Sequence, residues 1–263
     1  MGLKFVVIGV IHPYLTFEQV ENSILSIKKQ TLLPNKIIIF IDSNVSPKCE
    51  KLILNSDLPI NLVQNNFLKK GLGYHLSQIH KYVDKNIDLI LRFDFDDENY
   101  PNRFEIQVKY MQNNPNVDIC SSYYVNKFNK RIVKLPVENK QIKQLLPLCP
   151  IVHPAVCFRY NKIMSIGGYK NIPRHQDLDL WLRSSANGLN FSNIKTPLLV
   201  YDPPQKKQKF RDLVLNIKII WRYQNFLKIS FLKLVLFSFI IIFKELIPFR
   251  IKFILRRFFL LLF

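Results

Sequence analysis

Three carboxylates, Asp94, Asp96 and Asp97, lie within four consecutive positions directly after the mostly apolar segment 87–91. Strand alternation places Asp94 and Asp96 on one side and two phenylalanine rings on the other, where the rings anchor the strand end. Carboxylates that converge in a cationic protein need a cation, and hard oxygen ligands favour Mg²⁺ or Mn²⁺ with open positions for diphosphate oxygens. A solvated strand end or a helix cap would explain the triplet as well, so its surroundings have to decide.

The chain ahead of and around this cluster alternates predicted strands with predicted helices. The run 36–41 is apolar throughout, as expected of a parallel strand that is covered on both faces. Such a series predicts a doubly wound nucleotide-binding half, whose ligands gather at the carboxyl ends of the strands. The predicted strands cover 4–11, 36–41, 59–63 and the segment around Leu89, and the predicted helices cover 16–30, with Thr16 at its start, 46–54 and 73–86.

Asp42 directly follows the second predicted strand, so it should lie at the same sheet edge as the acidic cluster. An acid at this position can hydrogen-bond a base or a ribose, while the cluster holds a metal that bridges the phosphates. Asp42 could instead simply form a turn. Two acidic features at one edge nevertheless favour a nucleotide-diphosphate site.

The net charge of +19 is concentrated near the end of the chain. Residues 205–263 hold thirteen Lys and Arg against two acidic residues, interleaved with apolar and aromatic runs. The longest charge-free stretch of the hydrophobic part, 234–243, has ten residues, whereas a spanning helix needs roughly 20. We therefore expect helices that lie in the headgroup plane of an anionic membrane, the alternative being a core or oligomer-contact helix pair.

The cysteines and the N-terminus point to a reducing compartment. Cys49, Cys120, Cys149 and Cys157 are scattered without metal-type spacing, so we expect free structural thiols. The apolar run 5–11 is short and lacks a small-residue cleavage site, which predicts a first strand rather than a signal peptide.

The order of these features resembles a family 2 glycosyltransferase of the GT-A fold, of the bacterial type that builds exopolysaccharide, capsule or lipopolysaccharide. The resemblance runs from about Val6 to Tyr201, and Ser77 stands where the family usually has Asn. Seven ordered matches carry it, namely 23–31 with Pro34, Asp42, 70–77, 92–97 with 101–107, 150–159, 167–169 and 176–183.

This resemblance implies an α/β GT-A fold with a Rossmann-like nucleotide-binding half, a mostly parallel central sheet and C-terminal amphipathic helices. The implied domains are a transferase domain at 1–204 and a basic, hydrophobic, membrane-associating tail at 205–263. The implied activity is inverting transfer from a nucleotide-diphosphate sugar, with a UDP-sugar favoured, in cell-surface polysaccharide synthesis. The membrane-seeking tail favours a lipid-linked saccharide as the acceptor. The implied location is cytoplasmic, peripheral on the inner face of the plasma membrane, and no nucleic acid is expected as a partner.

The same resemblance assigns roles to individual residues. A base must take the acceptor proton while the leaving diphosphate is neutralised, and Asp177 matches the family's base. The donor residues are Asp42, Gly71, Gly73, Arg92 and Asp94; the ligands of Mn²⁺ or Mg²⁺ are Asp94 and Asp96 with Asp97; and the acceptor side holds His153, Gln176 and Trp181.

Two departures from the family pattern bear on activity. Gln176 replaces the usual Glu, which leaves Asp177 without like-charge repulsion and so more readily ionised but weaker as a base. Asp177 could also be a helix N-cap, and Asp179 is expected to pair with Arg183. Asp202 stands where the family usually has Arg, with no histidine following, and the nearby lysines at 206, 207 and 209 could replace it or form a solvated linker.

Other classes of protein remain open. A sugar nucleotidyltransferase would need a glycine-rich pyrophosphate loop after the first strand, where His12-Pro13-Tyr14 stands instead. A nucleic-acid-binding protein would explain the charge, although basic residues interleaved with apolar runs fit a membrane better. A degenerate, non-catalytic transferase is the third alternative. His153 fits a satisfied structural histidine better than a base.

Overall fold

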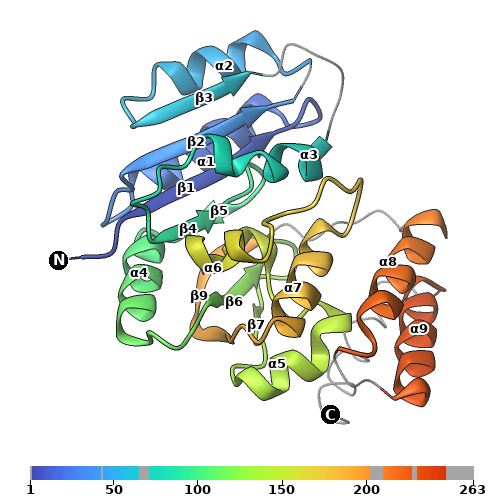
Figure 1. The fold of residues 1–263 in the computed structure, drawn as a ribbon. Helices are drawn as coiled ribbons and strands as arrows, with labels where there is room; N and C mark the ends of the chain where they lie inside the picture. Colours follow the sequence, from blue (N-terminus) through green and yellow to red (C-terminus); the bar gives the residue numbers. More distant parts are fainter. Residues whose placement is uncertain (1, 43, 65–70, 202–209, 227–229, 247–263) are drawn as a thin grey trace.

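The computed structural model describes residues 2–42, 44–64, 71–201, 210–226 and 230–246 (Figure 1). The predicted roles of Asp202 and the lysines at 206, 207 and 209, and of the tail beyond residue 246, lie outside these residues. The strands are β1 (Phe5–Ile11), β2 (Lys36–Ile41), β3 (Ile60–Gln64), β4 (Leu89–Arg92), β5 (Glu98–Asn99), β6 (Ile119–Asn126), β7 (Ile132–Val133), β8 (Cys157–Arg159) and β9 (Phe191–Tyr201). The α-helices are α1 (Phe17–Lys28), α2 (Pro47–Leu54), α3 (Gly71–Ser77), α4 (Arg103–Asn113), α5 (Asn139–Leu145), α6 (Tyr160–Ser165), α7 (Gln176–Ala186), α8 (Phe210–Tyr223) and α9 (Phe231–Leu246), and the 3₁₀ turns are η1 (Ile79–Lys81), η2 (Leu146–Leu148) and η3 (His153–Ala155).

One sheet runs through the molecule in the order β3-β2-β1-β4-β8-β6-β9-β5, with β7 beside β6. The first four strands are parallel, so their carboxyl ends share one edge. Beyond β4 the pairings are mixed, with β8 antiparallel to both neighbours and β6 parallel to β9. The predicted α/β architecture with a Rossmann-like half is confirmed.

Helices cover both faces of the sheet because its strands are apolar on both sides. In β1, Val7 packs in the core formed with α1, α2 and α4, whereas Ile8 packs in the core that includes residues of α3, α6 and α7. Thr16 begins α1 as predicted, because its side chain accepts from the Gln19 N–H in a capping box.

The predicted helix at 73–86 is wrong in length. Helix α3 ends at Ser77, and the chain continues as the 3₁₀ turn η1. The Ser77 hydroxyl donates to the Tyr74 carbonyl at 2.7 Å, and the Gln78 N–H donates to the His75 carbonyl three residues back. These i to i−3 bonds tighten the chain and end the α-helix.

The described part of the tail packs on the core of the α/β domain. Leu213, Ile219 and Ile220 of α8 and Leu234 of α9 belong to the same buried cluster as Trp181 of α7. Figure 1 shows α7, α8 and α9 side by side. None of the described helices combines the length and the apolar character that crossing a membrane requires. The four cysteines are free thiols, as predicted.

Candidate active site

The acidic cluster lies in a turn at the end of β4. The predicted strand alternation through residues 93–97 is wrong, because β4 ends at Arg92 and the Asp97 N–H donates to the Asp94 carbonyl at 3.3 Å. The rings of Phe93 and Phe95 are buried as predicted, with centroids 4.7 Å apart. They anchor the turn in the core, while the side chains of Asp94 and Asp96 between and after them stay partly exposed.

One carboxylate oxygen from each of Asp94, Asp96 and Asp97 lies within 4.8 Å of the other two. Asp97 is buried, and the other two are partly exposed. Three hard oxygen ligands at this spacing, open on one side, fit Mg²⁺ or Mn²⁺. The turn therefore brings in Asp97 as a full member of the set, which strand alternation did not foresee.

Arg92 is fully buried behind this cluster and donates from Nη2 to Asp94 Oδ1. Among the described residues, its Nε and Nη1 have no hydrogen-bond partner. A buried guanidinium with free donors is costly unless an anion satisfies it. Arg92 thus holds one carboxylate of the cluster and has donors left for a further acceptor.

A buried polar network from α4 holds the end of β4. Arg103 donates to the Arg92 carbonyl, to Asn99 Oδ1 and, at 2.9 Å, to Gln107 Oε1, and Gln107 in turn donates to the Ala155 carbonyl at 2.7 Å. Burial lowers the pKa of Arg103 to about 10, with the nearby Asp97 opposing the shift, so it remains charged at neutral pH. This support was not predicted, although Arg103 and Gln107 are spaced four apart as helix neighbours must be.

Asp42 is buried at the end of β2 between two histidines that the sequence reasoning missed. His12 Nδ1 lies 3.4 Å from Asp42 Oδ2, and His75 Nε2 lies 3.5 Å from Asp42 Oδ1. Burial lowers the pKa of His12, and its hydrogen bond to Asp42 opposes that effect. His12 follows β1 directly, so its place at this edge could have been predicted from the strand; the place of His75 on α3 could not.

The two glycines predicted to bind the donor, Gly71 and Gly73, are each required by the backbone, but for different reasons. Gly71 begins α3 with φ +73°, a conformation that glycine adopts without steric cost. A Cβ on Gly73 would lie 2.1 Å from the Ile172 carbonyl oxygen, so glycine permits α3 to approach the loop before α7. Their predicted contact with a donor stays a prediction.

Tyr14 links the Asp42 end of the edge to the acidic cluster. Its exposed ring stacks on His12, with centroids 5.1 Å apart and planes 13° apart. Desolvation by the neighbouring groups raises the pKa of Tyr14 to about 12, and the negative charges of Asp96 and Asp94 act in the same direction. Tyr14 thus contacts His12, which is bonded to Asp42, and also lies within reach of the charges of the cluster.

Asp177 lies in the first turn of α7, and the N-cap position belongs to His175. The Asp177 side chain is half-buried, and desolvation raises its pKa. The hydrogen bond from the Leu178 N–H opposes this shift. Asp177 was expected to ionise more easily because Gln176 replaces a Glu, but its burial acts in the opposite direction. The partly buried Tyr201 has its pKa raised first by burial and then by the negative charges of Asp97, Asp94 and, more weakly, Asp177. The base candidate and two carboxylates of the cluster thus act on the same tyrosine.

Two of the predicted acceptor-side residues, His153 and Trp181, pack against each other. His153 Nε2 lies 2.9 Å from the Tyr169 hydroxyl, and its ring meets the fully buried Trp181 edge-on at 6.1 Å. Burial holds the pKa of His153 well below its usual range, so it is neutral, as expected of a structural histidine. Gln176 is buried as well. Contact of these residues with an acceptor stays a prediction.

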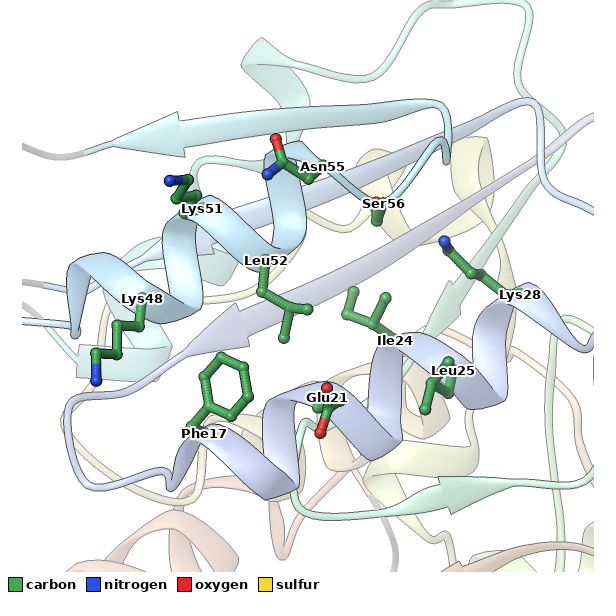
Figure 2. A pocket seen from close by; sticks show the side chains of 10 residues that line it. All are labelled: Phe17, Glu21, Ile24, Leu25, Lys28, Lys48, Lys51, Leu52, Asn55 and Ser56. Atoms are coloured by element: carbon green, nitrogen blue, oxygen red, sulfur yellow. The ribbon is translucent and has the colours of Figure 1, made fainter.

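A separate groove of about 410 Å³ lies between α1 and α2. Figure 2 shows Phe17, Ile24 and Leu52 at its apolar centre with lysines at its margins. None of its lining residues is a predicted site residue, so the groove is distinct from the candidate active site.

Comparison with known proteins agrees with this geometry. The family model of glycosyl transferase family 2 matches residues 10–169. An Escherichia coli UDP-Gal:alpha-D-GlcNAc-diphosphoundecaprenol beta-1,3-galactosyltransferase is 35% identical over 66% of this chain, which spans 65% of that enzyme's length. The amylovoran biosynthesis glycosyltransferase AmsE of Erwinia amylovora is 31% identical over 69% of this chain and 70% of its own.

Solved structures show the fold. The crystal structure of S. aureus TarS 1-349 superposes with a TM-score of 0.67 at 13% identity and covers 90% of this chain and 72% of that one. The match confirms the GT-A fold, and the family model favours a transferase over the nucleotidyltransferase alternative. Since the family model covers more than half of its residues, the chain belongs to glycosyltransferase family 2.

Proposed function

We propose that this chain transfers a sugar, with inversion, from a UDP-sugar to a hydroxyl group of a lipid-linked saccharide. The observation that carries the proposal is the cluster of three carboxylates beside Arg92, at the sheet edge that Asp42 also follows; the charge of Asp177 acts on the same Tyr201 as the charges of Asp94 and Asp97. In a family 2 chain these are a metal-diphosphate group, a nucleoside contact and a base.

The buried Asp42 suits a nucleoside, because a carboxylate accepts a hydrogen bond from a base N–H or a ribose hydroxyl. The E. coli relative is named for UDP-Gal, and TarS has been solved with UDP-GlcNAc at a TM-score of 0.65. Both support a uridine diphosphate donor here.

The diphosphate belongs beside the cluster at Asp94, Asp96 and Asp97. A bound Mg²⁺ or Mn²⁺ would neutralise charge on the departing diphosphate. The buried guanidinium of Arg92, which donates to Asp94, adds a positive charge behind the cluster.

Asp177 takes the proton in the transfer step. The acceptor oxygen forms the new bond to the anomeric carbon as its proton passes to the Asp177 carboxylate. The bond from that carbon to the diphosphate breaks, and its electron pair leaves with the nucleotide. The raised pKa of Asp177 makes it a stronger base than a solvated carboxylate.

The acceptor and the location follow from the relative and the tail. The E. coli enzyme is named for a sugar on diphosphoundecaprenol, a membrane-embedded carrier. Exposed apolar side chains on α9, including Leu232 and Phe239, together with the basic charge of residues 205–263, suit a peripheral position on an anionic cytoplasmic surface.

The test is a binding screen followed by a transfer assay. UDP-, GDP- and dTDP-sugars with Mn²⁺ should be compared by thermal shift, since a ligand of the native state raises Tm. UDP-galactose with a synthetic GlcNAc-diphospho-lipid is the first transfer pair. A shift by GDP- or dTDP-sugars alone would refute the uridine assignment, and no transfer to any diphospho-lipid saccharide would refute the acceptor class.

A further inference from the structure

Helix α8 holds the loop that leads into α7. Arg174 Nε lies 3.1 Å from Asp212 Oδ2, and His175 Nε2 lies 2.9 Å from the Asp212 backbone carbonyl oxygen. Asp212 stands in the first turn of α8 and is buried. A single residue of the tail therefore binds two consecutive loop residues, and the second of them is only two positions ahead of Asp177.

The backbone of this loop needs such support. His175 adopts the left-handed conformation, with φ 58° and ψ 28°, which a side chain with a Cβ rarely takes without compensating contacts. Because a carbonyl oxygen can only accept, the His175 Nε2 carries the proton and donates to Asp212. This bond fixes the turn from which α7 starts.

Two further contacts fix the same region. The Tyr223 hydroxyl, at the end of α8, donates to Asp179 Oδ1 at 3.0 Å, so α8 binds α7 on both sides of Asp177. On the donor side, Gly73 of α3 packs against the Ile172 carbonyl with no room for a Cβ. The loop before α7 is thus held between α3 and α8.

We propose that Asp212 is a positioning residue for Asp177, which it aligns through Arg174 and His175. The inference rests on the proposed role of Asp177 as the base. A displacement of about 1 Å at a reacting group can cost a hundredfold in rate. The residues proposed to bind the nucleoside and the metal follow β1, β2 and β4, so loss of the Arg174–Asp212 ion pair should lower kcat while donor affinity is kept.

The test compares two arginines that contact the same carboxylate. Arg174 approaches Asp212 from the loop, whereas Arg211 Nε lies 3.7 Å from Asp212 Oδ1 and comes from α8 itself. In the full chain, Asp212→Asn and Arg174→Gln should each lower kcat for UDP-galactose and the GlcNAc-diphospho-lipid by about 10- to 100-fold. The double variant should lose no more than either single one, and the matched control Arg211→Gln should keep the wild-type kcat.

Donor binding separates positioning from a folding defect. The Kd for UDP should be unchanged in Arg174→Gln, whose side chain is exposed and whose loss leaves the core intact. The proposal is overturned if Arg174→Gln matches Arg211→Gln in kcat, or if kcat and UDP binding fall together.

Hydrogen exchange gives a readout that does not need the substrates. Residues 172–180 should lose amide protection in Asp212→Asn and Arg174→Gln but not in Arg211→Gln. If the wild type turns over neither substrate, the proposed function has failed, and this measurement still judges the contact. Equal amide protection of residues 172–180 in all three variants would overturn the positioning role of Asp212.

Discussion

At the scale of single residues, the arrangement of Asp94, Asp96 and Asp97 predicts metal-dependent donor binding. Asp96→Asn should abolish the rise in Tm that a UDP-sugar produces with Mn²⁺, because it removes one of three ligands and one negative charge. The matched control is the exposed Asp84→Asn, which should keep the full rise. A rise in Tm that is unaffected by both a chelator and Asp96→Asn would contradict the metal assignment.

The assignment of Asp177 as the base predicts how kcat falls at low pH. A base works only when deprotonated, and burial raises the pKa of Asp177, so kcat should fall on acidification at a higher pH than an ordinary carboxylate would give. Asp177→Asn should lower kcat by about 10²- to 10⁴-fold. The measurement is kcat from pH 4 to 9, and an Asp177→Asn enzyme with an unchanged profile would show that the base is elsewhere.

The same raised pKa predicts an effect on stability. Asp177 keeps its proton to a higher pH in the folded state than in the unfolded state. Its protonated form therefore contributes to the free energy of unfolding at low pH, and this contribution is lost as the pH rises through the pKa of the folded state. Asp177→Asn mimics that form and should therefore have a higher Tm than the wild type at pH 7, with the difference shrinking toward pH 4. A lower Tm for Asp177→Asn at pH 7 would show that the carboxylate is stabilised by contacts rather than destabilised by burial.

The residues predicted from sequence were those whose type is chemically unusual at a strand end. Asp42 and the acidic cluster belong to this class, because the carboxyl ends of parallel strands meet at one edge. His75 and Arg103 could not be placed, because they reach the edge through the packing of α3 and α4. Packing depends on contacts between distant segments, which local patterns do not record.

At the scale of elements, α4 and α7 each contain an acid–base ion pair at i,i+4 spacing, one at the surface and one buried. Asp179 and Arg183 of α7 are buried and 3.1 Å apart, while Glu105 and Lys109 of α4 form the same i,i+4 pair at the surface. Asp179→Asn should cost about 3–5 kcal/mol, because it leaves a buried guanidinium uncompensated. Glu105→Gln should leave the urea midpoint unchanged. Equal midpoints for the two variants would mean that water reaches Arg183.

The elements were predicted well where hydrophobic period and caps agree, as in β2 and in α1 with its Thr16 cap. They were predicted poorly where one local hydrogen bond changes the backbone. The Ser77 hydroxyl ends α3 early, and the turn after Arg92 replaces the expected strand. Both errors follow from side-chain and turn bonds that compete with regular structure.

At the scale of the whole molecule, the described part of the tail has apolar residues both in the core and at the surface. One face of α8 and α9 packs in the core with Trp181, which sequence composition alone did not distinguish from a membrane face. Other residues of the same region are large, apolar and exposed, namely Phe226 after α8 at 70% and Leu232 and Phe239 of α9 at 80% and 59%. The core-helix alternative from the sequence is therefore confirmed for the packed face, and the membrane alternative stays a prediction for the exposed residues.

The exposed face predicts binding to anionic vesicles. The full chain should cosediment with phosphatidylglycerol-rich vesicles and be released by high salt, because its tail charges are screened. The double variant Leu232→Ser with Phe239→Ser should bind about a hundredfold more weakly, since each side chain contributes about 1.5 kcal/mol when buried. The matched control is Leu54→Ser with Phe128→Ser, which are 65% and 52% exposed on other surfaces and should leave binding unchanged. If both double variants bind like the wild type while Leu232→Ser with Phe239→Ser alone lowers the solution mass to that of a monomer, the face is an oligomer contact and the membrane assignment is wrong.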